Sequence, residues 1–339
     1  MSAFSDAQRE ELRGLLCQLG DRIRDAVIEA RDQSTHAEMS AVAEVTPADV
    51  IYAIDKVSEE AILEWFRIHW PDTLPVEVIL EGLEDHPGPV TFPEGIDVSK
   101  TQAVALIDPI DGTRGLMYDK RAAWALVGLA PRKADGGDLD LRSIEIAAMT
   151  EIPVSRQWRA DQVSAVKGHG VVAEAVDVRA GNRAPVSLQP ATNADCLHGF
   201  ASVARFLPPA KGALGAFEED LWKRLYPGEA AAVIFEDQYI STGGQFYEIL
   251  CGHDRFIADL RPYAYQKLGY STELMCHPYD VATALVLEEA GCLVEDPLNG
   301  SLRAPLDTTS PVAWVAYANV ALAEAMRPVL RACIADHFG

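Results

Sequence analysis

The chain has 339 residues, of which 49% are hydrophobic and 24% charged, the balance of an ordinary globular protein. It carries 29 basic and 51 acidic residues, and a net charge of −22 disfavours nucleic acid as a partner. No run approaches the ~20 apolar residues of a membrane span, so no membrane partner is expected, and the length favours two domains.

The compartment follows from the first residues and the cysteines. Met1–Asp6 lacks the basic and apolar segments of a secretory signal. The six cysteines are scattered and none forms a Cys-x-x-Cys pair, which is typical of unpaired thiols in a reducing compartment. We therefore expect a cytoplasmic protein.

The first part of the chain predicts two helices and a sheet. Apolar residues recur every three or four positions over the first 31 residues and again over 56–69, where Asp55 or Ser58 could cap the helix. Strands that follow one another with short turns favour an antiparallel sheet packed on these helices. Apolar runs rich in β-branched residues predict those strands at 76–80, 103–107, 124–129, 144–149 and 162–166.

A change in residue composition along the chain predicts a domain boundary. Residues 179–195 are rich in Pro, Asn, Ala and Gly and show no periodicity. We therefore expect an N-terminal helix-plus-sheet domain, 1–183, and a C-terminal α/β domain, 184–339. In the second domain, helices near 217–225, 243–251 and 281–290 alternate with strands near 232–235 and 255–259. The last of these helices should end at Gly291, a residue type that favours left-handed caps.

Two acidic side chains follow a predicted strand in the segment Asp108–Thr113, which reads Asp-Pro-Ile-Asp-Gly-Thr. Pro109 restricts the backbone, so the turn can aim both carboxylates into one space. Like charges held that close need a proton or a cation between them, and oxygen ligands suit Mg²⁺. Gly112 would let an anion approach the backbone amides. An Asp-Pro and Asp-Gly turn without function is the alternative.

Two further acidic segments indicate a function only in combination with the segment Asp108–Thr113. Asp280 precedes the helix predicted at 281–290, either as its N-cap or as a carboxylate aimed at the same ion site. Glu81 and Glu84 follow the strand predicted at 76–80 and, taken alone, are acids of a loop.

In this order, the segments resemble the inositol monophosphatase family, whose superfamily includes fructose-1,6-bisphosphatases and 3′-phosphoadenosine 5′-phosphate phosphatases. The resemblance runs from about residue 45 to 300 and includes an Asp-x-x-Ser-Glu segment at 55–59, a glycine turn at 167–170 and a small-residue helix start at 241–244. It implies an α/β sandwich of alternating helix and sheet layers, with a Mg²⁺-dependent phosphomonoesterase site between the two halves.

The resemblance also implies a set of metal ligands. Glu81, Asp108 and the carbonyl of Ile110 would hold one ion, and Asp108, Asp111 and Asp280 would hold a second. Phosphate monoester hydrolysis is among the slowest uncatalysed reactions, and two ions would stabilise both the attacking and the leaving oxygen.

Water and substrate contacts are implied in the same way. Glu81 and Thr113 would orient the attacking water. Asp111, Gly112 and Thr113 would lie against the phosphate, and Glu273 would contact a substrate hydroxyl. We therefore predict hydrolysis of a small polyol or sugar phosphate, with 3′-phosphoadenosine 5′-phosphate or fructose 1,6-bisphosphate as the alternative substrates. A homodimer is expected from the resemblance alone.

Departures from the family pattern leave some points open. Leu80–Gly82 replaces the usual Gly-Glu-Glu, so Glu84 could replace Glu81 as the metal glutamate. No lysine lies within 34–55, where many members carry one near a third ion, so we expect two or three Mg²⁺ ions, with Mn²⁺ able to replace them.

Three rival functions stay open at this point. A haloacid-dehalogenase-type phosphatase also uses an aspartate motif with Mg²⁺, but with one residue between its aspartates where Asp108 and Asp111 have two. A catalytically inactive binding module would keep the fold without the chemistry. A glycosidase would need only two suitably placed carboxylates.

Overall fold

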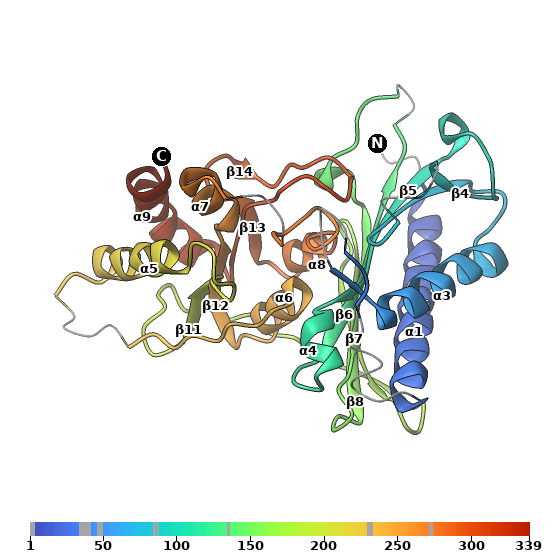
Figure 1. Ribbon diagram of the computed structural model, residues 1–339, viewed down its shortest axis with the longest axis horizontal. Helices are drawn as coiled ribbons and strands as arrows, with labels where there is room; N and C mark the ends of the chain where they lie inside the picture. The colour runs from blue at the N-terminus through green and yellow to red at the C-terminus, as the bar shows by residue number, and fades with distance from the viewer. Residues whose placement is uncertain are drawn as a thin grey trace.

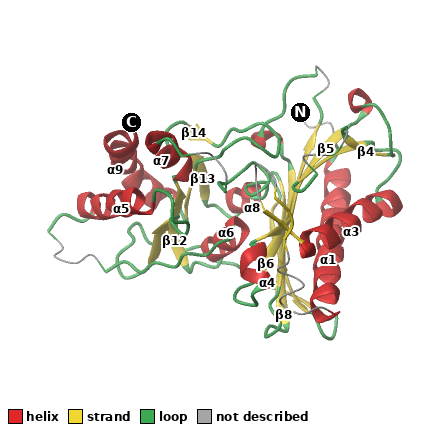
Figure 2. Ribbon diagram, viewed as in Figure 1, coloured by secondary structure: helices red, strands yellow, loops and turns green. Residues whose placement is uncertain are grey.

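The computed structural model describes residues 4–33, 42–45, 50–83, 86, 88–133, 136–228, 233–270 and 274–339. Layers of helices and sheets alternate across this part of the chain (Figures 1 and 2). Helices α1 (Asp6–Gln33) and α3 (Ala53–His69) form the outer layer beside an eight-stranded sheet. A middle layer contains α6 (Thr242–Leu250) and α8 (Ala284–Glu289), and a five-stranded sheet and three more helices complete the stack. The predicted α/β sandwich is confirmed.

The eight-stranded sheet has the order β10-β9-β8-β7-β6-β5-β3-β4. Its strands are β3 (Val76–Leu80), β4 (Val90–Phe92), β5 (Ala103–Asp111), β6 (Ala123–Pro131), β7 (Ile146–Ile152), β8 (Arg159–Val166), β9 (Gly170–Asp177) and β10 (Arg183–Pro185). All neighbours are antiparallel except β3 and β5, which are parallel because the chain crosses back through β4 and a 3-10 turn, η1 (Val98–Lys100), before β5 begins. The prediction of a wholly antiparallel sheet is wrong at this pair.

The five-stranded sheet has the order β11-β12-β15-β13-β14. Its strands are β11 (Phe200–Val203), β12 (Asp254–Asp259), β13 (Leu293–Asp296), β14 (Gly300–Ser301) and β15 (Trp314–Tyr317). The outer helices beside it are α5 (Lys211–Leu225), α7 (Arg261–Leu268) and α9 (Val320–Phe338). Smaller elements are β1 (Val42–Val45), β2 (Val50–Tyr52), α4 (Thr113–Met117) and the 3-10 turn η2 (Leu141–Ser143).

Apolar side chains fill each space between layers. Leu16 and Phe66 lie in the core between the first helices and the larger sheet, and Phe246 and Trp314 lie between the two sheets. Phe217 lies in the core beneath the outer helices. Strands β5 and β6 are buried along their whole length because layers cover both of their faces, which explains their continuous apolar runs.

Several predicted boundaries differ from the structure. Helix α3 begins at Ala53, so Asp55 and Ser58 lie inside it and neither is its N-cap. The helix predicted at 281–290 begins only at Ala284, after a series of turns, so Asp280 is not its N-cap either. Gly291 does adopt the predicted left-handed conformation, with φ of +86°.

Other predictions concern the linker and the surface. Of the strand predicted near 232–235, only Phe235 forms an isolated bridge, to Phe200, and residues 229–232 lie outside the described residues. The division into two domains at 183/184 stays a prediction.

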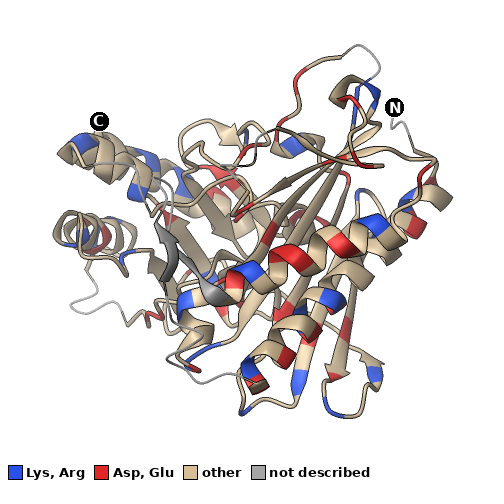
Figure 3. Ribbon diagram, turned by 45° about the vertical axis from the view of Figure 1, so that its right-hand side comes forward, with Lys and Arg blue, Asp and Glu red and all other residues tan. Residues whose placement is uncertain are grey.

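All six cysteines are free, and among the described residues every helix is too short or too polar to cross a membrane. Figure 3 shows basic positions interspersed with acidic ones on helices of both halves.

Candidate metal-binding active site

The candidate site begins where β3 ends beside the middle of β5. Leu80 pairs with Ile107 in the parallel ladder, and the amide of Glu81 donates a 3.1 Å hydrogen bond to the Ile107 carbonyl. Since the two strands run in the same direction, Glu81, directly after β3, and Asp108, within β5, both follow a paired residue and lie side by side. The one parallel pair in this sheet therefore brings the two acids into proximity.

Strand β5 continues past Asp108 through an irregular segment. The pairing with β6 is interrupted between Asp108 and Asp111, as at a β-bulge, a feature that re-aims side chains. The Asp108 carboxylate is almost fully buried and accepts a 3.1 Å hydrogen bond from the amide of Ile110. Gly112 has φ of +97°, and a Cβ there would lie 3.0 Å from the Cβ of Ser241, so a larger residue would not fit.

The first residues of α6 hold the Asp111 carboxylate. Ser241 Oγ donates a 2.8 Å hydrogen bond to Asp111 Oδ2, and the amide of Gly243 donates to the same oxygen. Ser241 is also the N-cap of α6, since its Oγ accepts from the amide of Gly244. A Cβ on Gly243 would lie 2.7 Å from the Leu126 side chain, so small residues are needed for this approach. Ser241 and Gly243 were absent from the predicted site residues, although the small-residue run was noticed.

Asp280 reaches the same place from the C-terminal half of the chain. It lies in the turn before α8, and its Oδ2 accepts a 2.7 Å hydrogen bond from the amide of His277. One carboxylate oxygen from each of Asp108, Asp111 and Asp280 lies within 4.8 Å of the others. Three of the predicted ligands therefore meet in a cluster that could hold a metal ion.

The electrostatics of this cluster fit a cation. Burial raises the pKa of Asp108 well above its usual value, and the charges of Glu81, Asp111 and Asp280 raise it further. Burial also raises the pKa of Asp111 to about 7, with the Asp280 charge adding to it and hydrogen bonds from α6 opposing it. Buried carboxylates that repel one another ionise fully only beside positive charge, and an all-oxygen donor set is the one that Mg²⁺ prefers.

A second polar group lies beside the cluster at the start of α4. Thr113 Oγ1 lies 2.7 Å from the Ile110 carbonyl and 3.1 Å from Asp55 Oδ1, and it can donate to either. Asp55 comes from the first turn of α3, in a different layer. Asp55 was not among the predicted site residues, and its only sequence signal was the Asp-x-x-Ser-Glu segment.

These groups border a cavity of about 110 Å³. Its polar lining includes Glu81, Asp108, Ile110, Asp111, Gly112, Thr113, Arg114, Ser241, Thr242, Gln245, Arg261, His277, Tyr279 and Asp280. Phe206 and Leu207 line it as well, from the segment that follows β11. Two predicted residues, Glu84 and Glu273, lie outside the described residues, so the choice between Glu81 and Glu84 as the metal glutamate stays a prediction, with Glu81 among the residues that line the cavity.

Solved structures share this architecture at low sequence identity. Fructose-1,6-bisphosphatase from Leishmania major, in its holo form, has a TM-score of 0.66 and 13% identity over 94% of this chain and 92% of its own. Extragenic suppressor protein SuhB from Bartonella henselae has a TM-score of 0.62 and 14% identity, covering 95% of this chain and 98% of its own. A Pyrococcus horikoshii protein with similarities to inositol-1 monophosphatase has a TM-score of 0.62 and 14% identity, over 94% and 98%.

Comparison by sequence gives a different result from comparison by structure. No protein-family model matches the chain, and no curated protein sequence matches it. The likeness is therefore carried by the arrangement of the elements, and the chain has the fold of the inositol monophosphatase and fructose-1,6-bisphosphatase superfamily.

Proposed function

We propose that the protein is a Mg²⁺-dependent phosphomonoesterase that transfers the phosphoryl group of a small ester directly to water. The observation that carries the proposal is the convergence of Asp108 and Asp111, both buried, with the half-buried Asp280 from the other half of the chain. Solved neighbours with this fold include a fructose-1,6-bisphosphatase and a protein similar to inositol-1 monophosphatase.

The donor set defines which residues would hold the ions. Asp108, Asp111 and Asp280 would bind through carboxylate oxygens, and Glu81 and the Ile110 carbonyl would complete the set. When bound, two or three divalent ions, Mg²⁺ or Mn²⁺ in its place, supply charge that neutralises the phosphate and lowers the pKa of water. By holding these ions, the carboxylates would give an acidic protein a place that attracts an anion.

The residues beside the cluster orient the water and the ester. Thr113 Oγ1 carries one proton, which it donates to Asp55 Oδ1 or the Ile110 carbonyl, and its lone pairs can accept a proton from water. Asp55 is then the acceptor at the end of this short chain, and Glu81, which lines the same cavity, would also orient the water. The amides of Gly112 and Thr113 bind phosphate oxygens at the start of α4.

The substrate class is a small polyol or sugar phosphate. Support comes from the small cavity, about 110 Å³, and from Phe206 and Leu207, whose apolar surfaces suit the carbon face of a ring. Glu273 would contact a hydroxyl of the same ring. Fructose 1,6-bisphosphate and 3′-phosphoadenosine 5′-phosphate are the alternatives, and the protein would act as a cytoplasmic homodimer, which light scattering can test.

A substrate panel tests the proposal. Phosphate release from inositol, sugar and nucleotide phosphates would be measured with Mg²⁺ and again with EDTA. We expect release from at least one ester only with Mg²⁺, and loss of that release in Asp108→Asn, whereas Asp72→Asn, on an exposed loop, keeps it. No Mg²⁺-dependent release from the whole panel would favour a binding module, and a trapped aspartyl-phosphate at Asp108 would favour the haloacid-dehalogenase mechanism.

A further inference from the structure

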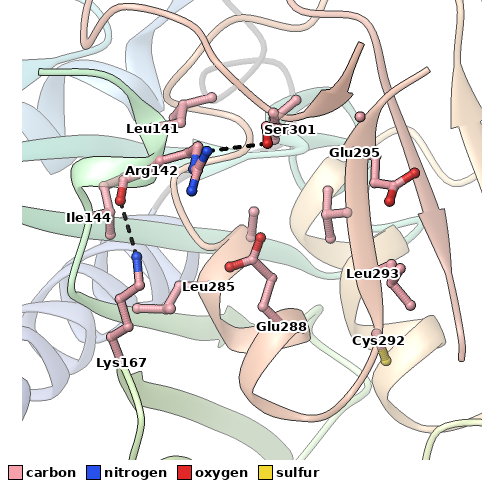
Figure 4. Close-up of a pocket in the computed structure, with 14 residues that line it drawn as sticks. Leu141, Arg142, Ile144, Lys167, Leu285, Glu288, Cys292, Leu293, Glu295 and Ser301 are labelled. Atoms are coloured by element: carbon pink, nitrogen blue, oxygen red, sulfur yellow. Dashed lines mark hydrogen bonds between the residues drawn. The ribbon is translucent and has the colours of Figure 1, made fainter. Parts of the chain in front are cut away.

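A second cavity, of about 340 Å³, lies between the two sheets at the last turn of α8 (Figure 4). None of its lining residues belongs to the cavity of the carboxylate cluster. Its walls come from η2, the turn after β8, α8 and the β13–β14 hairpin. The volume is at the lower end of the roughly 300–1,000 Å³ that small-molecule sites occupy.

Two cations project toward this cavity, one from η2 and one from the turn after β8. Arg142 donates a 3.2 Å hydrogen bond from Nη1 to Ser301 Oγ, and Lys167 donates one of 3.2 Å from Nζ to the Arg142 carbonyl (Figure 4). Within the described ranges, neither side chain forms an ion pair with a carboxylate. Other basic side chains of this acidic chain do, including Arg159 with Asp161. Both cations act electrostatically on one nearby carboxylate, that of Glu288, and its single charge leaves part of their positive charge available for an anionic ligand.

An acidic side chain faces the same space. Glu288, on the last turn of α8, extends toward Arg142 in Figure 4, and no hydrogen bond or ion pair joins it to the other described residues. A purely anionic ligand bound by Arg142 and Lys167 would be repelled by this carboxylate. A ligand that also carries an ammonium group would pair with it instead.

The floor of the cavity is apolar. It consists of Leu141, Ile144, Leu285, Cys292 and Leu302, all of them buried. Such a surface stabilises the carbon body of a ligand, and the few polar groups around it fix the ligand's orientation.

We propose that this cavity binds a small molecule of the α-amino acid type. Arg142 and Lys167 hold the carboxylate, Glu288 holds the ammonium group, and an apolar side chain covers the floor. An arginine and a carboxylate form strong charge-assisted hydrogen bonds, which a lysine beside them reinforces. The site is separate from the carboxylate cluster and does not depend on the proposed phosphatase function.

Calorimetric titration of the metal-free protein with each standard L-amino acid tests this site. EDTA keeps divalent ions from the carboxylate cluster, so the result is independent of catalysis. We expect at least one amino acid with an apolar side chain to bind with a Kd of about 1 mM or tighter. Absence of binding by the whole set would overturn the proposal.

Matched variants separate specific from general charge effects. Arg142→Gln with Lys167→Gln should weaken binding at least about tenfold, because two charge-assisted contacts are lost. Lys211→Gln with Lys223→Gln, both exposed on α5, changes the net charge equally and should leave binding unchanged. Equal binding by the first pair and the wild type would refute the site.

The ammonium contact has its own test. Glu288→Gln should weaken binding of the amino acid but not of its analogue that lacks the amino group. Glu219→Gln, at an exposed position on α5, is the control with the same charge change. If the analogue bound the wild type as tightly as the amino acid, or if a crystal soaked with the best binder showed it elsewhere, the assignment would be wrong.

Discussion

Asp111 and Ser241 lie 130 positions apart in the chain, and Ser241 Oγ donates a 2.8 Å hydrogen bond to Asp111 Oδ2. The same serine caps α6, so one side chain both stabilises the helix start and positions a carboxylate of the candidate metal site. The orientation of Asp111 therefore depends on the packing of α6 against β5 and β6. This packing requires that position 243 carry no side chain, as Gly243 does.

Replacing Ser241 by alanine should affect both roles. Loss of the cap should cost about 1 kcal/mol of unfolding free energy. Loss of a partner that orients a metal ligand should lower Mg²⁺-dependent activity about 10–100-fold. Asn319→Ala is the control, because Asn319 caps α9 by accepting from the Leu322 amide and does not line the cavity of the cluster. It should lose similar stability in thermal unfolding and keep its turnover; equal loss of activity in both variants would count against a positioning role.

The carboxylate cluster should be a source of instability when no cation is present. Asp280→Asn removes one of three carboxyl groups whose oxygens lie within 4.8 Å of one another, and the amide can still accept the hydrogen bond from His277. We expect the unfolding free energy in EDTA to rise by about 1–4 kcal/mol, the repulsion of one close pair at intermediate dielectric. Mg²⁺ should raise the thermal midpoint of the wild type and not of the variant. A variant that is less stable than the wild type in EDTA would argue against repulsion in the cluster.

The hydroxyl of Thr113 should matter more than its shape. Thr113→Val keeps the volume but loses the contacts with Asp55 and the Ile110 carbonyl, so kcat should fall about 10²–10⁴-fold, the range for loss of a positioned proton-transfer group. Thr113→Ser keeps a hydroxyl and should retain most of the rate. Steady-state kinetics on both variants test this, and similar rates for valine and serine would remove Thr113 from the mechanism.

Glu151 should make stability depend on pH away from the site. Burial raises the pKa of Glu151 from 4.5 to about 7, against hydrogen bonds from Asp161 and Gln157. The folded state therefore keeps a proton that the unfolded state loses as pH rises through 4.5. Stability from this group falls between about pH 4.5 and 7, by up to about 3 kcal/mol, and is constant above that range.

Glu151→Gln isolates this effect. Denaturant unfolding in EDTA at several pH values would give the difference in unfolding free energy between variant and wild type. That difference should shift in favour of the variant from pH 4.5 to 7.5 and then stop changing. A difference independent of pH would show that Glu151 ionises normally in the folded protein.

Local patterns predicted the central elements well and the edges poorly. The apolar runs of β5 and β6 are continuous because both faces are buried, so these strands were recognised directly. Strands β13, β14 and β15 have four residues or fewer, too short for a periodic signal. Helix α9 contains Pro328, a residue that normally ends a helix, and it was missed.

Contacts between residues far apart in the chain limited how much of the candidate site could be predicted from the sequence. Asp108 and Asp111 were recognisable because they follow one strand, and Asp280 because its segment resembles a family motif. The contact between Asp55 and Thr113 and the anchoring of Asp111 by Ser241 depend on how layers pack, and the residues themselves carry no local signal for it. The cap predicted at Asp280 failed because turns occupy the positions before α8.

The most direct test of the central claim is anomalous diffraction from crystals soaked in Mn²⁺. We predict an anomalous peak bounded by carboxylate oxygens of Asp108, Asp111 and Asp280, and its loss in Asp280→Asn crystals soaked in the same way. A wild-type map without a peak among these three side chains would contradict the account.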